Sequence, residues 1–452
     1  MTTKKTSKTN PPKDAPPKPP AAKQICSYCG KAREEVSKII ETPDKAPVRA
    51  FICNECISVC QTMIDIERQK SRKIPEPVIN VQTPQELYDY LNDYVISQDA
   101  AKRYLSTAVY NHYKRVKANI QAGRSGDKDE IEIDKSNVLL IGPSGSGKTH
   151  ILKYLSKYAN VPFTIADATT LTEAGYVGED VENVVTRLFQ AAGGDTLEEK
   201  VQNAEMGIVF IDEIDKIGRR GESRSLTKDP SGEGVQQALL KLLEGTTCNI
   251  PLDPRAGGRK HPGQQTIPIS SQNILFVLGG AFDGLNDIVK KRVSKTAGIG
   301  FGSEGEKKNA KTKFNSDDYL DQVIVEDLMK YGMIPELLGR IPMVTVLKEL
   351  TTDELRQVFT EPKNAILKQY QKLFKMDDKE LIITDDAIEY IVQIAFDMRI
   401  GARSLRGVLE KGLADCMFEA PSSKKKTIKI TREFLEAKLG KEKGENKEKK
   451  VA

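Results

Sequence analysis

Short, continuous apolar runs alternate with stretches of helical periodicity through the middle of the chain. The runs occupy residues 138–141, 161–165, 208–211, 274–278 and 343–346. Segments that are apolar at every position suit the strands of a parallel sheet that is covered on both faces. Because helical stretches separate them, the pattern predicts a doubly wound α/β core.

The same pattern divides the rest of the chain into further domains. Apolar spacing from Thr83 predicts two helices that reach about residue 122, and the first begins with Pro84 at its first turn. After about Glu349 the pattern becomes mainly helical, with one late strand at 427–430. The predicted organisation is a basic tail, a cysteine-bearing module, a polar linker, a large α/β domain, a smaller helical domain and a second tail, at 1–23, 24–62, 63–82, 83–348, 349–436 and 437–452.

The chain has 452 residues and a net charge of +5, but the excess positive charge lies in its two tails. Residues 1–23 carry six Lys and one Asp, and residues 437–452 carry six Lys and three Glu, which leaves −3 for residues 24–436. We expect both tails to be disordered. The folded body is therefore not a basic surface, and this argues against nucleic acid as a partner.

The sequence also predicts where the protein resides. No run of 18 apolar residues is present, so no membrane-spanning segment is expected. The N-terminus continues into Pro and Lys without the apolar core of a secretory signal. We therefore expect a cytoplasmic protein without a membrane partner.

A phosphate-binding motif follows the first apolar run. The pattern G-x-x-x-x-G-K-[ST] is met between an apolar strand and a helix, which is the context that this motif requires. Its glycines let backbone N–H groups turn towards phosphates, Lys148 would neutralise the β- and γ-phosphates, and Thr149 would place its hydroxyl on Mg²⁺. The predicted ATP-binding residues are Gly142, Pro143, Ser144, Gly145, Ser146, Gly147, Lys148 and Thr149.

Two carboxylates follow the third apolar run. Asp212 and Glu213 come at the carboxyl end of strand 208–211, where ligands bind in open α/β sheets. Asp212 would hold the Mg²⁺ shell, and Glu213 would polarise the attacking water as general base. The alternative is a surface acidic turn, since Asp215 and Lys216 follow. The position after an intervening strand favours the catalytic interpretation, and the sequence predicts an ATP hydrolase.

Four cysteines form two Cys-x-x-Cys pairs in the N-terminal module. Cys26 and Cys29 are separated by 23 residues from Cys53 and Cys56. Four thiolates at this spacing can close a tetrahedral Zn²⁺ site, and a module of about 40 residues needs such a cross-link. Cys60 is an alternative to Cys56 as the fourth ligand. The zinc is expected to be structural, and the long gap predicts an extended hairpin around residues 42–47.

Several longer segments are similar to the ClpX family of AAA+ proteins. They span residues 110–115, 175–180, 231–241, 279–282 and 401–406, and the resemblance covers roughly residues 24–435. It implies a ring, usually of six subunits, with ATP bound between neighbours. Arg340 corresponds to the family's arginine finger and Arg403 to its second sensor, while Val95 and Ile96 correspond to contacts of the adenine.

The chain departs from the family pattern in the segment that follows Ile96. Ser97 stands where the family usually carries Gly, near the adenine pocket. The strand at 274–278 ends in Gly279 and Gly280, so no polar sensor side chain is assigned there.

The resemblance also implies how such a ring contacts polypeptides. It gives the substrate-gripping pore loop to Gly175, Tyr176, Val177 and Gly178, and a second, basic pore loop to Arg259, Lys260 and His261. Ile299, Gly300 and Phe301 correspond to the tripeptide that docks onto the ClpP peptidase. The zinc module is expected to dimerise and to recruit substrates or adaptors. Taken singly, these short segments are typical of ordinary turns, solvated loops and linkers.

The leading hypothesis is therefore an ATP-dependent protein unfoldase, a homo-hexamer that recognises tagged proteins and delivers them to ClpP. An AAA+ remodelling chaperone that acts without a protease is the alternative. The related HslU proteins lack a four-cysteine module and an Ile-Gly-Phe loop. A nucleic-acid translocase is disfavoured by the charge of the body, and a zinc adaptor without enzymatic activity would require inert Lys148 and Glu213.

Overall fold

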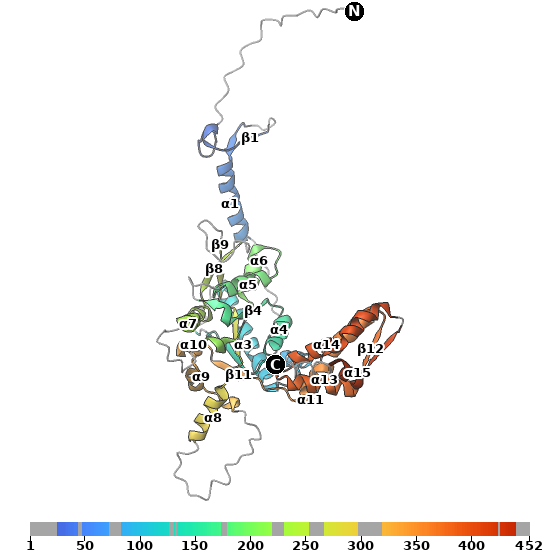
Figure 1. Cartoon of the computed structure of the whole chain (residues 1–452). Helices are drawn as coiled ribbons and strands as arrows, with labels where there is room; N and C mark the ends of the chain where they lie inside the picture. The colour runs from blue at the N-terminus through green and yellow to red at the C-terminus, as the bar shows by residue number, and fades with distance from the viewer. Residues whose placement is uncertain are drawn as a thin grey trace, which may run out of the picture. The chain divides into compact units, whose positions relative to one another are not determined.

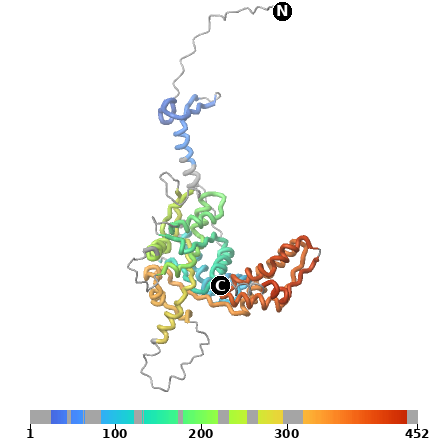
Figure 2. Tube along the Cα trace, in the orientation of Figure 1, coloured from blue at the N-terminus to red at the C-terminus, as the bar shows by residue number. Residues whose placement is uncertain are grey.

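The computed structural model describes residues 25–43, 48–71, 83–125, 131, 133–172, 179–218, 230–252, 266–296, 319–423 and 425–439. The chain divides into two units, Met1–Glu76 and Pro77–Ala452. Figure 1 labels their helices and strands, and Figure 2 follows the Cα trace of the same view.

The N-terminal unit is built on a short antiparallel hairpin that leads into a helix. β1 (Ile39–Glu41) pairs with β2 (Phe51–Cys53), and α1 (Asn54–Ser71) follows directly. The pairing of Glu41 with Phe51 confirms a hairpin between them, although residues 44–47 of the predicted turn lie outside the described residues. Helix α1 continues to Ser71, so residues 63–71 of the predicted linker are helical.

A five-stranded parallel sheet forms the centre of the second unit, as the sequence predicts. Its strand order is β11-β3-β10-β7-β4. All four neighbouring pairs run parallel. The bounds are β11 (Met343–Val346), β3 (Val138–Ile141), β10 (Leu275–Gly280), β7 (Ile208–Asp212) and β4 (Phe163–Asp167). The predicted strand at 161–165 begins two residues later, and β10 continues through both glycines.

Helices cover both faces of this sheet, which explains why its strands are apolar at every position. Successive residues of a strand point to opposite faces, so Leu139 and Val138 enter different cores. On the Leu139 face pack α5 (Asn183–Ala191), α6 (Leu197–Glu205), α7 (Pro230–Glu244), α8 (Leu285–Thr296), α9 (Val325–Tyr331) and α10 (Pro335–Gly339). On the Val138 face pack α2 (Pro84–Asn92), α3 (Asp99–Ser125) and α4 (Lys148–Ala159).

The start of α2 agrees with the sequence prediction in detail. The Thr83 side chain accepts a hydrogen bond from the backbone N–H of Glu86, and Pro84 occupies the first helical position. A side-chain acceptor at the cap satisfies one of the N–H groups that a helix start leaves unpaired. Proline lacks an N–H and is tolerated in the first turn.

Small β elements border two stretches that lie outside the described residues, and a helix precedes a third. β5 (Leu171–Thr172) and β6 (Glu179–Asp180) flank residues 173–178. The antiparallel hairpin of β8 (Thr247–Pro251) and β9 (Thr266–Ser270) flanks residues 253–265. Helix α8 precedes residues 297–318.

The C-terminal part of this unit is mainly helical and has a separate hydrophobic core. Its helices are α11 (Thr352–Thr360), α12 (Ile366–Met376), α13 (Asp385–Asp397), α14 (Arg403–Glu419) and α15 (Arg432–Leu439). Phe359, Ile391 and Leu409 are fully buried in that core. The predicted late strand is β13 (Thr427–Ile430), and it pairs in parallel with β12 (Glu380–Ile383).

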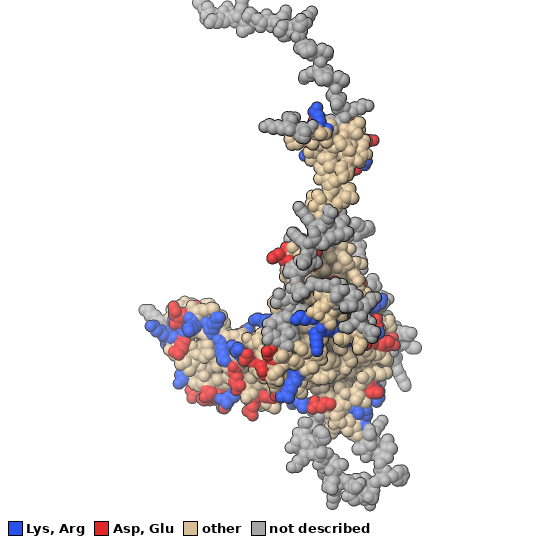
Figure 3. Space-filling model, turned by 180° about the vertical axis from the view of Figure 1, so that it is seen from behind, with Lys and Arg blue, Asp and Glu red and all other residues tan. Residues whose placement is uncertain are grey.

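The surface of the described part carries no single dominant charge on the face that Figure 3 shows. Basic and acidic side chains are interspersed over it. Among the described residues, no helix combines the length and apolar character that crossing a membrane requires.

Candidate functional site

A cavity of about 780 Å³ lies between the carboxyl ends of the sheet strands and the helical C-terminal domain. Four sets of predicted residues line it: the loop between β3 and α4, the acidic pair at the end of β7, the segment after α2, and Arg403 of the helical domain. These lining residues are Pro143, Ser144, Gly145, Ser146, Gly147, Lys148, Thr149, Asp212, Glu213, Val95, Ile96 and Arg403. Gly142 lies just behind the cavity wall, where its N–H donates to Gly280 O at 3.1 Å.

The loop between β3 and α4 has the backbone of an anion cradle. Gly145 and Gly147 have φ values of +79° and +104°, which glycine adopts without strain. A Cβ on Gly145 would lie 2.2 Å from the carbonyl oxygen of Ile400, so a side chain there would push the helical domain away. Helix α4 begins directly after this loop, and its N-terminal N–H groups face the same space.

Lys148 extends along this loop. Its Nζ donates to Gly142 O at 2.5 Å and to Pro143 O at 3.0 Å. Desolvation by burial lowers the pKa of this ammonium, while Asp212 and Asp215 oppose that shift. A buried ammonium held only by carbonyl oxygens gains a stronger partner when an anion enters. The loop and the lysine therefore fit a phosphate group.

The acidic pair leaves the sheet through a sharp turn. Asp212 is the last residue of β7, and its Oδ1 accepts from the backbone N–H of Glu213 at 3.0 Å. Glu213 has a φ of +59°, in the left-handed region that is uncommon for a side chain of this size. This turn puts both carboxylates on the cavity wall, where oxygen ligands suit a divalent cation.

A third carboxylate in this turn was not predicted as functional. Asp215, in the short helix η3 (Ile214–Ile217), is only 2% exposed and also lines the cavity. Neither of its oxygens has a hydrogen-bond partner, and the Lys216 ammonium lies 3.4 Å from Oδ2. The burial of Asp215 on the cavity wall shows that this segment is not solvent-exposed throughout, as a simple surface acidic turn would be.

Asp215 also explains a glycine at the end of β10. A Cβ on Gly280 would lie 2.4 Å from Oδ1 of Asp215. The carboxylate thus occupies the space that a side chain of β10 would need. No local pattern in the sequence marks Asp215, because Asp212 belongs to β7 and the 3₁₀ helix begins only at Ile214.

The other end of the cavity is apolar. Val95 and Ile96 lie there with Leu350, Val358 and Ile366 from the helical domain. Such a surface suits the flat face of a nucleobase.

The turn after Ile96 shows why glycine would be favoured at the position of Ser97. Ser97 and Gln98 have φ values of 57° and 60°, which is costly for residues with a Cβ. The buried Gln98 amide bonds both backbone groups of Lys348, donating to its O at 2.8 Å and accepting from its N at 3.0 Å. These two bonds hold the left-handed turn without a glycine.

The two predicted arginines occupy different places. Arg403, at the start of α14, lines the cavity with its Nη1 3.5 Å from Ser144 Oγ. Arg340 does not line it; its guanidinium instead pairs with Glu244 at 2.8 Å and is 57% exposed. Arg340 is therefore available to another molecule rather than to the cavity of its own chain.

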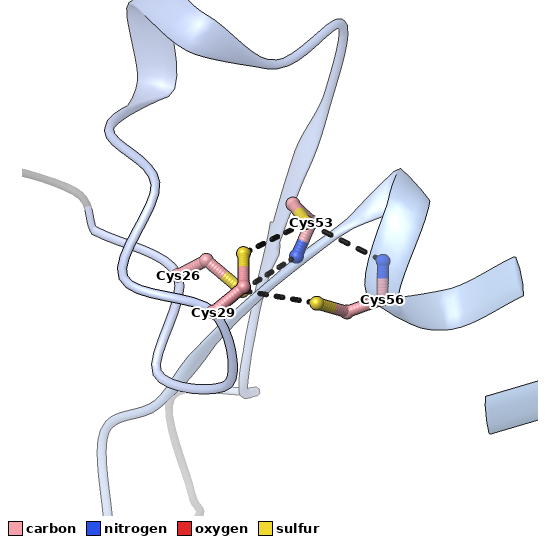
Figure 4. A group of neighbouring side chains, drawn as sticks. All are labelled: Cys26, Cys29, Cys53 and Cys56. Atoms are coloured by element: carbon pink, nitrogen blue, oxygen red, sulfur yellow. Dashed lines mark hydrogen bonds between the residues drawn. The ribbon is translucent and has the colours of Figure 1, made fainter. Parts of the chain in front are cut away.

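The four predicted cysteine ligands converge in the N-terminal unit, as Figure 4 shows. Their sulfur atoms all lie within 4.8 Å of one another, and the set does not include Cys60. The Cys26–Cys56 and Cys29–Cys53 sulfur separations are 3.9 and 3.7 Å. Tetrahedral zinc–thiolate bonds of about 2.3 Å require separations of about 3.8 Å. The group therefore fits Zn²⁺ with no open position.

The backbone around Cys26 favours its thiolate, whereas burial raises the pKa of Cys56. The N–H of Cys53 points to Cys26 Sγ at 3.3 Å, and that of Cys56 to Cys53 Sγ at 3.4 Å. Although burial opposes ionisation, hydrogen bonds from the backbone of Cys29, Cys53 and Tyr28 lower the pKa of Cys26 to about 6. Thiolates are the form that binds zinc.

Three predicted groups lie outside the described residues. They are Gly175, Tyr176, Val177 and Gly178; Arg259, Lys260 and His261; and Ile299, Gly300 and Phe301.

Comparisons with known proteins identify similar families for three parts of the chain. Three family models match: the ClpX C4-type zinc finger at residues 24–65, the AAA domain (Cdc48 subfamily) at 133–344, and the C-terminal, D2-small domain of ClpB protein at 350–432. The chain is also similar to the ATP-dependent Clp protease ATP-binding subunit ClpX of Treponema denticola. The two are 49% identical over 415 residues, which is 91% of this chain and 94% of the relative.

Proposed function

The chain belongs to the ClpX family and is an AAA+ ATPase, and on that premise we propose that it unfolds proteins and delivers them to a ClpP peptidase. In this proposal six copies form a cytoplasmic ring, and tagged or adaptor-bound proteins are drawn through its centre. The zinc module recruits these substrates and adaptors.

The observation that carries the proposal is that one cavity is lined by both domains of the second unit. Gly145 and Ile400 approach so closely that even a methyl group would not fit between them. The N–H of Ala402 donates to Gly145 O at 3.3 Å, and Arg403 follows it. A nucleotide in this cavity contacts both domains, so its hydrolysis and release change the angle between them. That motion is the mechanical output of the proposed machine.

Each cavity residue has a chemical role in this proposal. Lys148 and the N–H groups of its loop bind the β- and γ-phosphates, and Glu213 takes a proton from the attacking water. Thr149 and Asp212 hold Mg²⁺, which supplies positive charge to the phosphate oxygens when bound. Arg403 contacts the nucleotide from the helical domain. Arg340 acts on the γ-phosphate in the neighbouring subunit, which agrees with its exposure away from its own cavity.

Contact with the polypeptide and with the peptidase is assigned to three short segments, at residues 175–178, 259–261 and 299–301. Tyr176, between glycines, grips varied side chains by contact area with little demand for sequence. Arg259, Lys260 and His261 admit the tag at the pore entrance. Ile299 and Phe301 insert into apolar clefts on the peptidase ring.

The test combines the purified full chain with ClpP and a folded substrate that carries a degradation tag. We expect ATP-dependent loss of the substrate, ATPase stimulation by unfolded protein, and no stimulation by DNA. The Glu213→Gln variant should bind ATP without hydrolysing it, because the amide cannot accept the proton of water. Normal turnover in this variant would exclude Glu213 as the base.

Deletion of residues 299–301 separates this function from remodelling without a protease. The deletion should preserve ATPase and unfolding but abolish degradation, because only docking is removed. Degradation at the normal rate would eliminate the docking assignment. Unfolding by the intact chain without any degradation beside ClpP would favour the remodelling chaperone.

A further inference from the structure

A polar side chain lies among the apolar residues at one end of the cavity. Asn364, in the loop between α11 and α12, lines the cavity beside Ala365 and Ile366. It is half-buried, so its amide must find partners in the protein or in a ligand.

One side of this amide is already occupied. Asn364 Nδ2 donates to the Tyr154 hydroxyl at 2.5 Å. Tyr154 belongs to α4 and does not line the cavity, whereas Asn364 does. The amide is planar with its nitrogen and oxygen on opposite sides. With Nδ2 directed at Tyr154, the carbonyl oxygen Oδ1 is the polar atom that Asn364 offers to the cavity.

The position of Tyr154 is held by aromatic neighbours. Its ring stacks on Tyr94 with centroids 4.1 Å apart and an interplanar angle of 17°, and the His150 ring meets it edge-on at 4.8 Å. Both neighbours line the cavity. A ring contacted in this way keeps its hydroxyl in one place, where it accepts the hydrogen bond from Asn364 Nδ2.

The backbone of the Asn364 loop is held as well. Gln369 Nε2 donates to Asn364 O at 2.6 Å, and the N–H of Lys363 donates to Asp93 O at 2.9 Å. The Lys363 ammonium also reaches the Asp93 carboxylate at 2.7 Å. These contacts tie the loop of the helical domain to the end of α2. The backbone that carries the Asn364 side chain is therefore held in place in the folded site.

We propose that Asn364 and Tyr154 form a base-reading pair that selects a 6-aminopurine nucleotide over a 6-oxopurine one. Asn364 Oδ1 accepts a hydrogen bond from the exocyclic amino group of adenine, and Tyr154 positions the amide. Guanine and hypoxanthine carry an acceptor at this position, which would face a second acceptor. The inference deepens the proposed ATP site and does not depend on the peptidase or on the substrate protein.

The test measures binding of ADP and of inosine diphosphate, which carries a carbonyl in place of the amino group. Both are titrated against the full-length protein by displacement of a fluorescent ADP analogue, so that hydrolysis plays no part. We expect the wild type to prefer ADP. In Asn364→Leu the preference should fall about tenfold, mainly through weaker ADP binding, because a buried donor loses its acceptor.

Two further variants separate base reading from a general loss of the site. Tyr154→Phe should lower the preference by strengthening inosine diphosphate binding, because the amide becomes able to rotate and offer its N–H₂. Asn364→Asp keeps an acceptor and should keep the preference for ADP. Tyr158→Phe is the matched control, since its ring belongs to the same aromatic cluster and lies 4.8 Å from that of Tyr90. It should behave as the wild type.

The outcomes distinguish failure of this inference from failure of the site. Equal weakening of both nucleotides in Asn364→Leu, or an unchanged preference in Tyr154→Phe, would overturn base reading while leaving the ATP site intact. A wild type that binds neither nucleotide would overturn both.

Discussion

The guanidinium of Arg340 is held by the carboxylate of Glu244 in its own chain, with Nη2 2.8 Å and Nε 2.9 Å from Oε1. Its backbone is anchored by the Asn137 amide, which donates to Arg340 O at 2.8 Å. Both side chains of the pair are largely exposed, and exposed ion pairs contribute only about 0.2–1 kcal/mol. The backbone is thus fixed, while the side chain exchanges partners at little cost.

This arrangement predicts that Arg340 acts on a neighbouring subunit. Arg340→Ala should bind ATP normally and lose hydrolysis, because the γ-phosphate of the neighbouring subunit loses its arginine. Glu213→Gln should also bind ATP and lose hydrolysis, because the attacking water loses its base. Mixing the two inactive variants in equal amounts should restore ATPase at about a quarter of the sites in a randomly assembled ring. At these sites an intact Glu213 faces an intact Arg340 of the neighbouring subunit. Steady-state ATPase of the mixture measures this. A mixture as inactive as its components would exclude action between subunits.

Asp215 predicts a gain of stability when its charge is removed. Its carboxylate is almost fully buried and has no hydrogen-bond partner. Asp215→Asn keeps the shape without the charge and should stabilise the nucleotide-free protein by about 1–3 kcal/mol. Urea unfolding measures this. Asp283→Asn is the control, because Asp283 also pairs with Lys216 but its side chain is 78% exposed, and we expect little change. A destabilised Asp215→Asn would mean that the pair with Lys216 is net favourable.

The cysteine cluster predicts which thiols hold zinc. Wild type and Cys60→Ser should each contain about one zinc per chain, whereas Cys29→Ser should lose it, because a structural site needs all four ligands. Metal analysis of the purified proteins gives the answer. ATPase activity should persist in Cys29→Ser, since the cluster and the cavity belong to different units. Zinc loss in Cys60→Ser would return Cys60 to the ligand set.

A buried histidine predicts how stability depends on pH. Burial lowers the pKa of His112 to about 3, and the positive charges of Arg115 and Lys135 add to the shift. An unfolded histidine has a pKa of about 6.5. Between these values the unfolded chain binds the extra proton, so His112 contributes stability above pH 6.5 that is lost as the pH falls towards 3.

The measurement for His112 is urea unfolding between pH 5 and 6.5. One proton corresponds to a slope of about 1.4 kcal/mol per pH unit, and His112→Gln should reduce the wild-type slope by up to that amount. The variant keeps a donor for Asn273 O, which His112 Nε2 meets at 3.1 Å. Identical slopes in the two proteins would show that His112 does not titrate on unfolding.

The sequence determined the elements and the chemistry that depend on local pattern. The buried strands were found because both faces of the sheet are covered, which leaves every position apolar. The phosphate loop was found because the glycines and Lys148 must be contiguous for one backbone turn to cradle an anion. The spacing of the cysteine pairs likewise indicated the metal site, since two short segments must each supply two thiolates, and the structure then selected Cys56 over Cys60.

Features that depend on distant contacts follow from the packing of the folded chain. Asp215 lies in an ordinary acidic segment, and its role follows from burial against Gly280, 65 residues away in the sequence. Asn364 and Tyr154 are separated by 210 residues and come from different domains, so no local pattern relates them. Periodicity and motifs reflect the local structure and chemistry of one segment. Burial and side-chain orientation arise only when segments pack together. The free energy of a buried polar group depends on the neighbours that this packing provides.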